Sequence, residues 1–181
     1  MQLNELVKEI SFNGETKKCE ITSITYDSRK VKEGTLFVAI AGFNVDGHDY
    51  IDQAIKKGAA AILANGRSPK TTSIPIIQVK NPRIALSQIA AEFYGNPSKS
   101  LQVFGITGTN GKTSITHILH HIIQESGVDC GTMGTLGFKT PTGMVSTGFT
   151  TPESIEVHQM LKTLKMAKIN NVIMEVSSHA L

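Results

Sequence analysis

The chain has 181 residues, a formal net charge of +3 and a hydrophobic content of 40%. This length and composition exclude disorder of the whole chain and allow one or two globular domains, each with a hydrophobic core. The small net charge does not indicate nucleic-acid binding, no apolar run is long enough to span a membrane, and the charged first residues lack the apolar stretch of a signal peptide.

The cysteines and the first half of the chain favour a cytoplasmic α/β protein. Cys19 and Cys130 are far apart and form no CxxC pair, so we expect a reducing compartment and neither a disulfide framework nor a zinc site. Apolar and alternating runs predict strands, which we place at residues 21–26, 36–41, 60–64 and 76–79. Helices are predicted at 49–57, ending at Gly58, and after Asn81, with Asn81 as N-cap and Pro82 in the first turn. The core stripe of this second helix is Ala85, Ile89 and Phe93.

A segment rich in Gly, Pro, Asn and Ser then predicts a domain boundary. We place a first domain at 1–95, a linker at 96–100 and a second domain at 101–181. The second domain is expected to hold a strand at 101–107, a helix at 112–126, a strand and hairpin within 130–146, a helix at 152–167 and a strand at 171–176. The expected inward-facing residues of its two helices are Ile115, Ile118, Leu119, Ile122 and Ile123 in one and Val157, Met160, Leu161 and Leu164 in the other.

This order of elements predicts an α/β fold: a small N-terminal α/β domain followed by a truncated P-loop domain built on a parallel sheet. A parallel sheet of two or three strands is small for such a domain. We therefore expect the chain to be part of a longer protein, with the apolar faces of helices 112–126 and 152–167 partly uncovered.

The Gly-rich loop between strand 101–107 and helix 112–126 is the strongest functional signal. It reads GITGTNGKTS from Gly105 to Ser114, between an apolar strand and an amphipathic helix, which is the setting of a phosphate-binding loop. Lys112 offers a charge to phosphate and Thr113 a hydroxyl to Mg²⁺. The loop departs from GxxxxGK[ST], because position 106 is Ile and the glycine stands at 108. The alternative is a Gly-rich turn with an accidental Lys-Thr pair.

Glu175 is the second signal, because it ends an otherwise apolar strand. A carboxylate there is costly unless it is paired or binds a metal, so we expect it to organise Mg²⁺ beside the loop. The alternative is a glutamate on an edge strand that faces water. The role of the nearby His179 stays open.

Three further groups of polar residues have ordinary structural explanations. Thr150 and Glu153 can form a capping box at the start of a helix, or this helix start can bind a second anion; the sequence leaves both open. His117, His120 and His121 are expected on a solvated helix face rather than at a metal. The segments YDSR (26–29) and GFNVDG (42–47) each follow a strand and are either turns or ligand-binding loops.

Taken together, GITGTNGKTS, TTPE and MEVSSHAL resemble the central ATP-binding domain of the Mur ligases, in that order and spacing. YDSR, LFVAIAG and DGHDYI resemble the N-terminal domain of the members that add the third amino acid. The resemblance covers essentially the whole chain and implies that the ATP phosphates are held by Gly108, Thr109, Asn110, Gly111, Lys112, Thr113 and Ser114. It implies catalytic roles for Lys112 and Glu175 and Mg²⁺ binding by Thr113 and Glu175.

The resemblance also implies a substrate, UDP-N-acetylmuramoyl-L-alanyl-D-glutamate. Its UDP part is expected at Tyr26, Ser28, Phe43, Asn44 and Val45, and its muramyl-peptide part at Thr150, Thr151 and Ser177. In the family, ATP phosphorylates the D-Glu carboxylate, and the amine of a diamino acid, meso-diaminopimelate or L-lysine, attacks the acyl phosphate. The family's carbamylated lysine and amino-acid-selecting domain would follow residue 181. The alternatives are a non-catalytic nucleotide-sugar-binding fragment and a P-loop kinase or NTPase of another kind.

Overall fold

The structure is a computed structural model, and it describes residues 1–42, 45–69, 72–140, 143–145 and 151–177. The chain divides into two compact units, Met1–Phe93 and Tyr94–Leu181. Within the described residues, no helix is long and apolar enough to cross a membrane. The expected domain bounds of 1–95 and 101–181 remain a prediction. Residues of the expected linker form a short 3-10 helix, η2 (Pro97–Ser100), which contacts a helix of the second unit.

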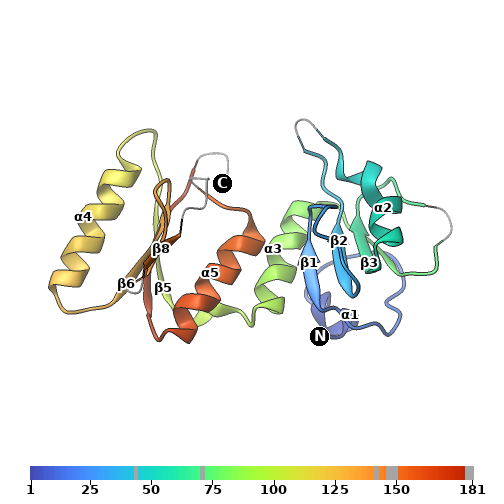
Figure 1. Cartoon of the computed structure of the whole chain (residues 1–181), viewed down its shortest axis with the longest axis horizontal. Helices are drawn as coiled ribbons and strands as arrows, with labels where there is room; N and C mark the ends of the chain where they lie inside the picture. Colours follow the sequence, from blue (N-terminus) through green and yellow to red (C-terminus); the bar gives the residue numbers. More distant parts are fainter. Residues whose placement is uncertain (43–44, 70–71, 141–142, 146–150, 178–181) are drawn as a thin grey trace. The chain divides into compact units, whose positions relative to one another are not determined.

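The first unit is a parallel four-stranded sheet in the order β1-β2-β3-β4. Its elements in chain order are α1 (Leu3–Leu6), β1 (Ser23–Thr25), β2 (Thr35–Val38), η1 (Gly47–Tyr50), α2 (Ile51–Lys56), β3 (Ala59–Ala64), β4 (Ile76–Gln78) and α3 (Pro82–Phe93). Helix α2 lies on one face of this sheet and α3 on the other (Figure 1). Strands β2 and β3 are therefore buried on both faces, as their apolar runs predicted.

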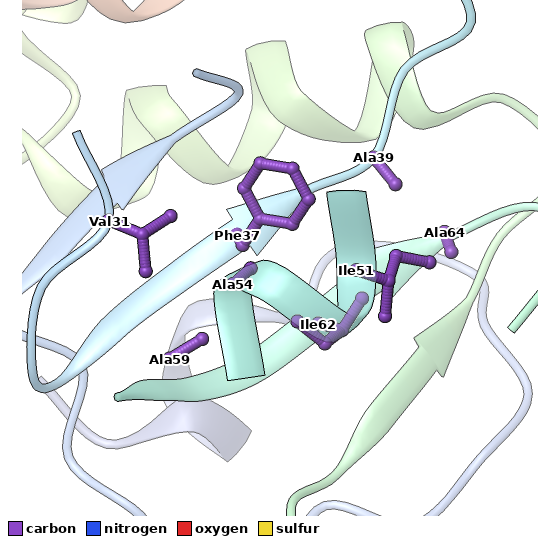
Figure 2. Close-up of a cluster of buried hydrophobic side chains, with 8 residues drawn as sticks. All are labelled: Val31, Phe37, Ala39, Ile51, Ala54, Ala59, Ile62 and Ala64. Atoms are coloured by element: carbon purple, nitrogen blue, oxygen red, sulfur yellow. The ribbon is translucent and has the colours of Figure 1, made fainter. Parts of the chain in front are cut away.

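The core of this unit on the α2 side is a cluster of small and large apolar side chains (Figure 2). Phe37 is its bulkiest side chain, and the alanines of α2 and β3 are small enough to let the helix approach the sheet closely. The cluster comprises Val31, Phe37, Ala39, Ile51, Ala54, Ala59, Ile62 and Ala64. Local signals are confirmed too: the Asn81 side chain accepts hydrogen bonds from the N–H groups of Arg83 and Ile84, at 3.0 and 3.2 Å, and caps α3.

The second unit is a mixed five-stranded sheet in the order β5-β9-β6-β7-β8. Its elements after η2 are β5 (Gln102–Ile106), α4 (Lys112–Glu125), β6 (Cys130–Gly134), β7 (Gly137–Thr140), β8 (Gly143–Val145), α5 (Ser154–Met166) and β9 (Asn171–Glu175). Strand β9 pairs in parallel with both β5 and β6, whereas β6, β7 and β8 form an antiparallel meander. Helices α4 and α5 lie on opposite faces of this sheet (Figure 1). The α/β fold is as predicted, with a parallel sheet in the first unit and a mixed sheet in the second, where only β5, β9 and β6 run parallel. Strands β7 and β8 form the predicted hairpin.

Helix α5 buries the face that its sequence predicted. Leu161 and Leu164 pack with Met133 and Val172 of the sheet, and Val157 and Met160 border the same cluster. Of the two alternatives for Thr150 and Glu153, the capping box is wrong, since α5 begins at Ser154 with Glu153 as its N-cap. Glu153 has an extended backbone, and its side chain makes no cap hydrogen bond.

Helix α4 differs from the prediction in the face that it turns to the sheet. Thr116 and His120 are buried against the sheet, whereas Ile115, Ile118 and Ile122 are half or more exposed. The helix contacts β6 and β9 mainly, and β5, the edge strand beyond β9, is itself exposed. The isoleucine stripe therefore lies partly uncovered within the described residues, as expected, and the expectation that His120 is solvated is wrong.

Candidate functional site

The Gly-rich loop joins β5 to α4 as predicted, and two of its glycines adopt backbone angles that favour glycine. Gly108 has a φ of 148°, and Gly111, the N-cap of α4, has a φ of 80°. Because Gly111 has no side chain to cap the helix, the first N–H groups of α4 are available to an anion. The Lys112 ammonium group donates a 2.8 Å hydrogen bond to the carbonyl oxygen of Gly108 and so lies over the loop.

Glu175 is buried at the carboxyl end of β9, with a relative exposure of 1%. Strand β9 lies between β5 and β6, and Glu175 pairs with Ile106, the last residue before the loop. Its carboxylate accepts a 3.0 Å hydrogen bond from the hydroxyl of Thr113, the second residue of α4. The alternative of a water-facing glutamate on an edge strand is therefore wrong. The structure brings an acid, a hydroxyl and a lysine together at one loop.

Thr135 is a further partner of Glu175 that the sequence did not reveal. Its N–H donates to one carboxylate oxygen at 3.2 Å, and its hydroxyl donates to the other at 3.0 Å. With the Thr113 hydroxyl, the buried carboxylate thus accepts three hydrogen bonds, which offset the cost of burying its charge. The only sequence signal was that Thr135 follows a strand directly.

Thr151 and Ser177 meet at the end of the same strand. The Thr151 hydroxyl donates to the backbone oxygen of Glu175 at 3.1 Å and accepts from the N–H of Ser177 at 3.0 Å. Thr151 of the TTPE segment and Ser177 of the MEVSS segment therefore meet at the carboxyl end of β9, where Thr151 holds the chain.

Phe43, Asn44, Thr150 and His179 lie outside the described residues. His120 is buried, and the described residues contain no group of three or more metal-ligating side chains of the His, Cys, Asp and Glu types.

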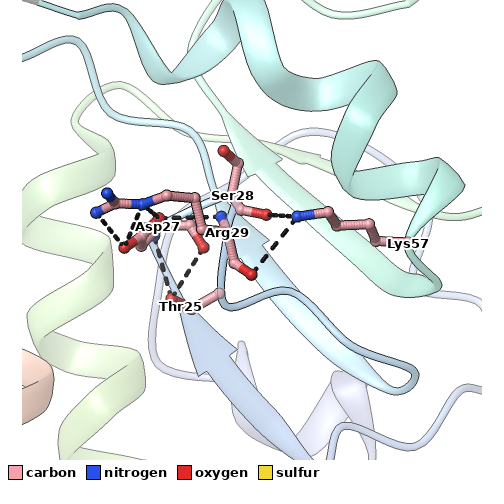
Figure 3. Close-up of polar contacts among 5 residues, drawn as sticks. All are labelled: Thr25, Asp27, Ser28, Arg29 and Lys57. Carbon is pink, nitrogen blue, oxygen red and sulfur yellow. Dashed lines mark hydrogen bonds and ion pairs between the residues drawn. The ribbon is translucent and has the colours of Figure 1, made fainter.

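The loop after β1 in the first unit is rigidly held (Figure 3). Arg29 donates from Nε and a terminal nitrogen to the two carboxylate oxygens of Asp27, at 2.9 and 2.8 Å. These hydrogen bonds lower the pKa of Asp27 from 3.8 to about 2. Lys57 donates to the carbonyl oxygen of Ser28 at 2.9 Å, and the Ser28 side chain points away from this network. Tyr26, which precedes Asp27, directly follows β1 and is half-buried.

The loop after β2 starts from the same edge of the sheet, because β1 and β2 are parallel neighbours. Its base closes through a bridge between Ala41 and Asp46, and Val45 is exposed. Asp46 accepts hydrogen bonds from the backbone N–H of His48 at 3.0 Å and from its ring at 2.6 Å, which lower the pKa of Asp46. Both polar loops are thus braced at their bases, at one edge of the first sheet.

The fold and the site together define a two-unit α/β protein with a loop of the phosphate-binding type beside a buried acid. Residues 20–94 match the family described as "Mur ligase family, catalytic domain", and residues 106–181 match "Mur ligase middle domain". The chain belongs to the Mur ligase family. It is homologous to the N-terminal domain and part of the middle domain of UDP-N-acetylmuramoyl-L-alanyl-D-glutamate--2,6-diaminopimelate ligases.

The relatives and solved structures agree with this assignment. The chain is 41% identical over 184 residues to a UDP-N-acetylmuramoyl-L-alanyl-D-glutamate--2,6-diaminopimelate ligase of Oceanobacillus iheyensis, covering 100% of the chain and 37% of the relative. A solved structure of a ligase with the same name superposes with a TM-score of 0.75 at 21% identity, covering 99% of the chain and 36% of that structure. MurF ligase from Thermotoga maritima in complex with ADP superposes with a TM-score of 0.58 at 26% identity, covering 86% of the chain and 32% of that structure. The chain thus spans about a third of the length of these proteins.

Proposed function

We propose that the chain forms the substrate-binding domain and part of the ATP-binding domain of a ligase that adds a diamino acid to UDP-N-acetylmuramoyl-L-alanyl-D-glutamate. The observation that carries the proposal is the 3.0 Å hydrogen bond between Thr113, beside Lys112, and the buried Glu175. The similarity to ligases specific for 2,6-diaminopimelate favours this amino acid over L-lysine. A cytoplasmic location follows from such a nucleotide-linked substrate and remains a prediction.

In this proposal the loop from Gly108 to Ser114 holds the ATP phosphates. Its backbone N–H groups and the N-terminus of α4 offer hydrogen bonds and partial positive charge. Lys112 already lies over the loop and would exchange its contact with Gly108 for a phosphate oxygen. The ADP in the related MurF ligase structure supports nucleotide binding by this fold.

The oxygen atoms at the site also fit Mg²⁺, because this ion prefers oxygen ligands such as a carboxylate and a hydroxyl. Glu175 and Thr113 would hold it, since the carboxylate oxygen and the hydroxyl oxygen that would ligate the ion are already 3.0 Å apart. A bound Mg²⁺ would neutralise phosphate charge that Lys112 alone cannot balance.

The muramyl substrate is proposed to use both units. Tyr26, Ser28 and Phe43-Asn44-Val45 would contact its UDP part, since the two loops start from one edge of the first sheet. Thr150, Thr151 and Ser177 would contact the muramyl-peptide part. ATP would phosphorylate the D-Glu carboxylate, and the diamino acid's amine would displace phosphate from this acyl phosphate to form the amide.

A chimera tests the function directly. The chain would replace the matching 184 residues of the Oceanobacillus relative, and the purified protein would be assayed with ATP, Mg²⁺, the muramyl dipeptide substrate and each diamino acid. We expect the tripeptide product with diaminopimelate, and none from the Lys112→Ala chimera. A folded chimera that binds UDP and ADP but makes no product would contradict the ligase proposal.

The 181-residue chain by itself separates the alternatives. We expect it to form no amide product, because correct placement of the amine contributes about 7–11 kcal/mol to such reactions and the chain covers only 37% of the relative. ATP hydrolysis without any muramyl substrate would favour another P-loop NTPase. Binding of UDP without any binding of ADP would favour a nucleotide-sugar-binding fragment.

A further inference from the structure

Two neighbouring residues, Gly134 at the end of β6 and Thr135 directly after it, lie against the Glu175 carboxylate. Thr135 donates one hydrogen bond to each carboxylate oxygen, from its N–H at 3.2 Å and from its hydroxyl at 3.0 Å. Two donors on two oxygens fix the plane of the carboxylate as well as its position. Thr113, by contrast, contributes a single hydrogen bond, to one oxygen.

Gly134 is needed for this close approach. Met133 pairs with Met174 across β6 and β9, so Gly134 lies directly beside Glu175. A Cβ at position 134 would overlap the carboxyl group and come within 2.7 Å of Cγ of Glu175. Any larger residue would therefore push the buried carboxylate away from its present position.

We propose that Gly134 and Thr135 form a carboxylate clamp that orients Glu175 toward the divalent cation of the bound nucleotide. The inference rests on the proposed function, because it assumes that nucleotide and cation bind at this loop. Thr113 belongs to the phosphate loop, and its hydroxyl is needed by the cation. Thr135 lies outside the loop, so its two hydrogen bonds can hold Glu175 whether or not the loop is occupied. Thr135 is thus a positioning residue.

The test compares four substitutions in the 181-residue chain. Thr135→Val removes the hydroxyl donor but keeps the backbone N–H and the side-chain shape. Thr135→Ser keeps both donors. Gly134→Ala keeps every donor but displaces the carboxylate, and Thr163→Val is the matched control, since the Thr163 hydroxyl donates only to Gln159 within α5.

Two readouts are measured for each protein. The first is the dissociation constant of ADP in EDTA, which reports on the phosphate loop alone. The second is the dissociation constant of Mn²⁺, from its paramagnetic broadening of the amide signals of Gly134 and Thr135, with and without ADP. We expect Thr135→Val and Gly134→Ala to weaken Mn²⁺ binding by about 10–100-fold, the range found for partners of metal ligands, and to leave ADP binding in EDTA within about twofold.

The outcomes separate the clamp from the function. Wild-type Mn²⁺ affinity in Thr135→Val, or a loss in Thr135→Ser as large as in Thr135→Val, would overturn the clamp. The clamp would also be overturned if Mn²⁺ did not broaden the amide signals of Gly134 and Thr135 in the wild-type chain. Absence of ADP binding to the wild-type chain in EDTA would instead count against the phosphate loop and the proposed function, and the Mn²⁺ comparison without ADP would still decide on the clamp.

Discussion

The ammonium group of Lys57, just after α2, donates a 2.9 Å hydrogen bond to the carbonyl oxygen of Ser28 in the loop after β1. It also reaches the carbonyl oxygen of Arg29 at 3.5 Å. A helix on one face of the sheet thereby holds a loop at the edge of the sheet, at a residue proposed to bind UDP.

Loss of this contact is expected to weaken UDP binding. Lys57→Met keeps the length of the side chain but releases the Ser28 loop. We expect the dissociation constant of UDP to rise about 3–10-fold, which corresponds to about 0.7–1.4 kcal/mol, the net contribution of one ordinary hydrogen bond. An NMR titration measures it. Lys56→Met, one residue earlier on an exposed position, is the control and should bind as the wild type does. Equal affinities in all three proteins would show that the loop needs no such support.

Lys112→Ala is expected to lower ADP affinity at least tenfold, because a full charge on phosphate is lost. Its free energy of unfolding should change by less than about 0.5 kcal/mol, since the group lies at an exposed loop and leaves no cavity. Calorimetric titration and urea unfolding measure the two effects. The exposed Lys165→Ala should change neither, and undiminished ADP binding by Lys112→Ala would remove the phosphate-loop assignment.

Asp27 makes stability depend on pH in the acid range. Its pKa falls from 3.8 to about 2 on folding, chiefly through the hydrogen bonds from Arg29, so the folded state binds fewer protons than the unfolded state in this range. The stabilisation is therefore complete above about pH 4 and is lost as the pH falls toward 2. We expect the difference in melting temperature between the wild type and Asp27→Asn to shrink over this interval.

His120 makes stability depend on pH nearer neutrality. Burial lowers its pKa, and the nearby charges of Lys139, His117 and His121 act in the same direction, against a backbone hydrogen bond with Cys130. Because the folded-state pKa lies below the unfolded value of about 6.5, the unfolded state takes up protons first, and stability is lost as the pH falls below that value. Urea unfolding at pH 7.5 and 5.5 should show a smaller loss of stability in His120→Leu than in the wild type. Identical losses would mean that other groups cause the effect.

Local chemistry made much of the fold predictable. Asn81 and Pro82 begin α3 as predicted, because a side-chain acceptor followed by a residue without N–H suits a helix start wherever it occurs. Gly58 ends the preceding helix with a φ of 91°, which glycine adopts without strain. The strand before the phosphate loop and the helix after it follow from periodicity alone. Such signals act between neighbours in the sequence, so they need no knowledge of the rest of the fold.

The unpredicted features depend on partners far away in the sequence. The stripe of Ile115, Ile118 and Ile122 marks an apolar face, but periodicity cannot tell whether any strand lies beneath it, and here the buried face carries Thr116 and His120 instead. The clamp on Glu175 likewise depends on which strand becomes the neighbour of β9. This strand order is set by packing of the whole unit, and no local pattern encodes it.

The position of β9 also determines the order in which the two units can form during synthesis. In the first sheet each strand pairs with the next one in the chain, so its structure can grow as the polypeptide emerges. In the second, β5 and β6 are separated by β9, which is synthesised after both, so Gln102 can pair with Asn171 only once β9 has been made. The phosphate loop therefore has no companion acid until residue 175 has left the ribosome, and we expect the second unit to be the slower folder and the main client of chaperones.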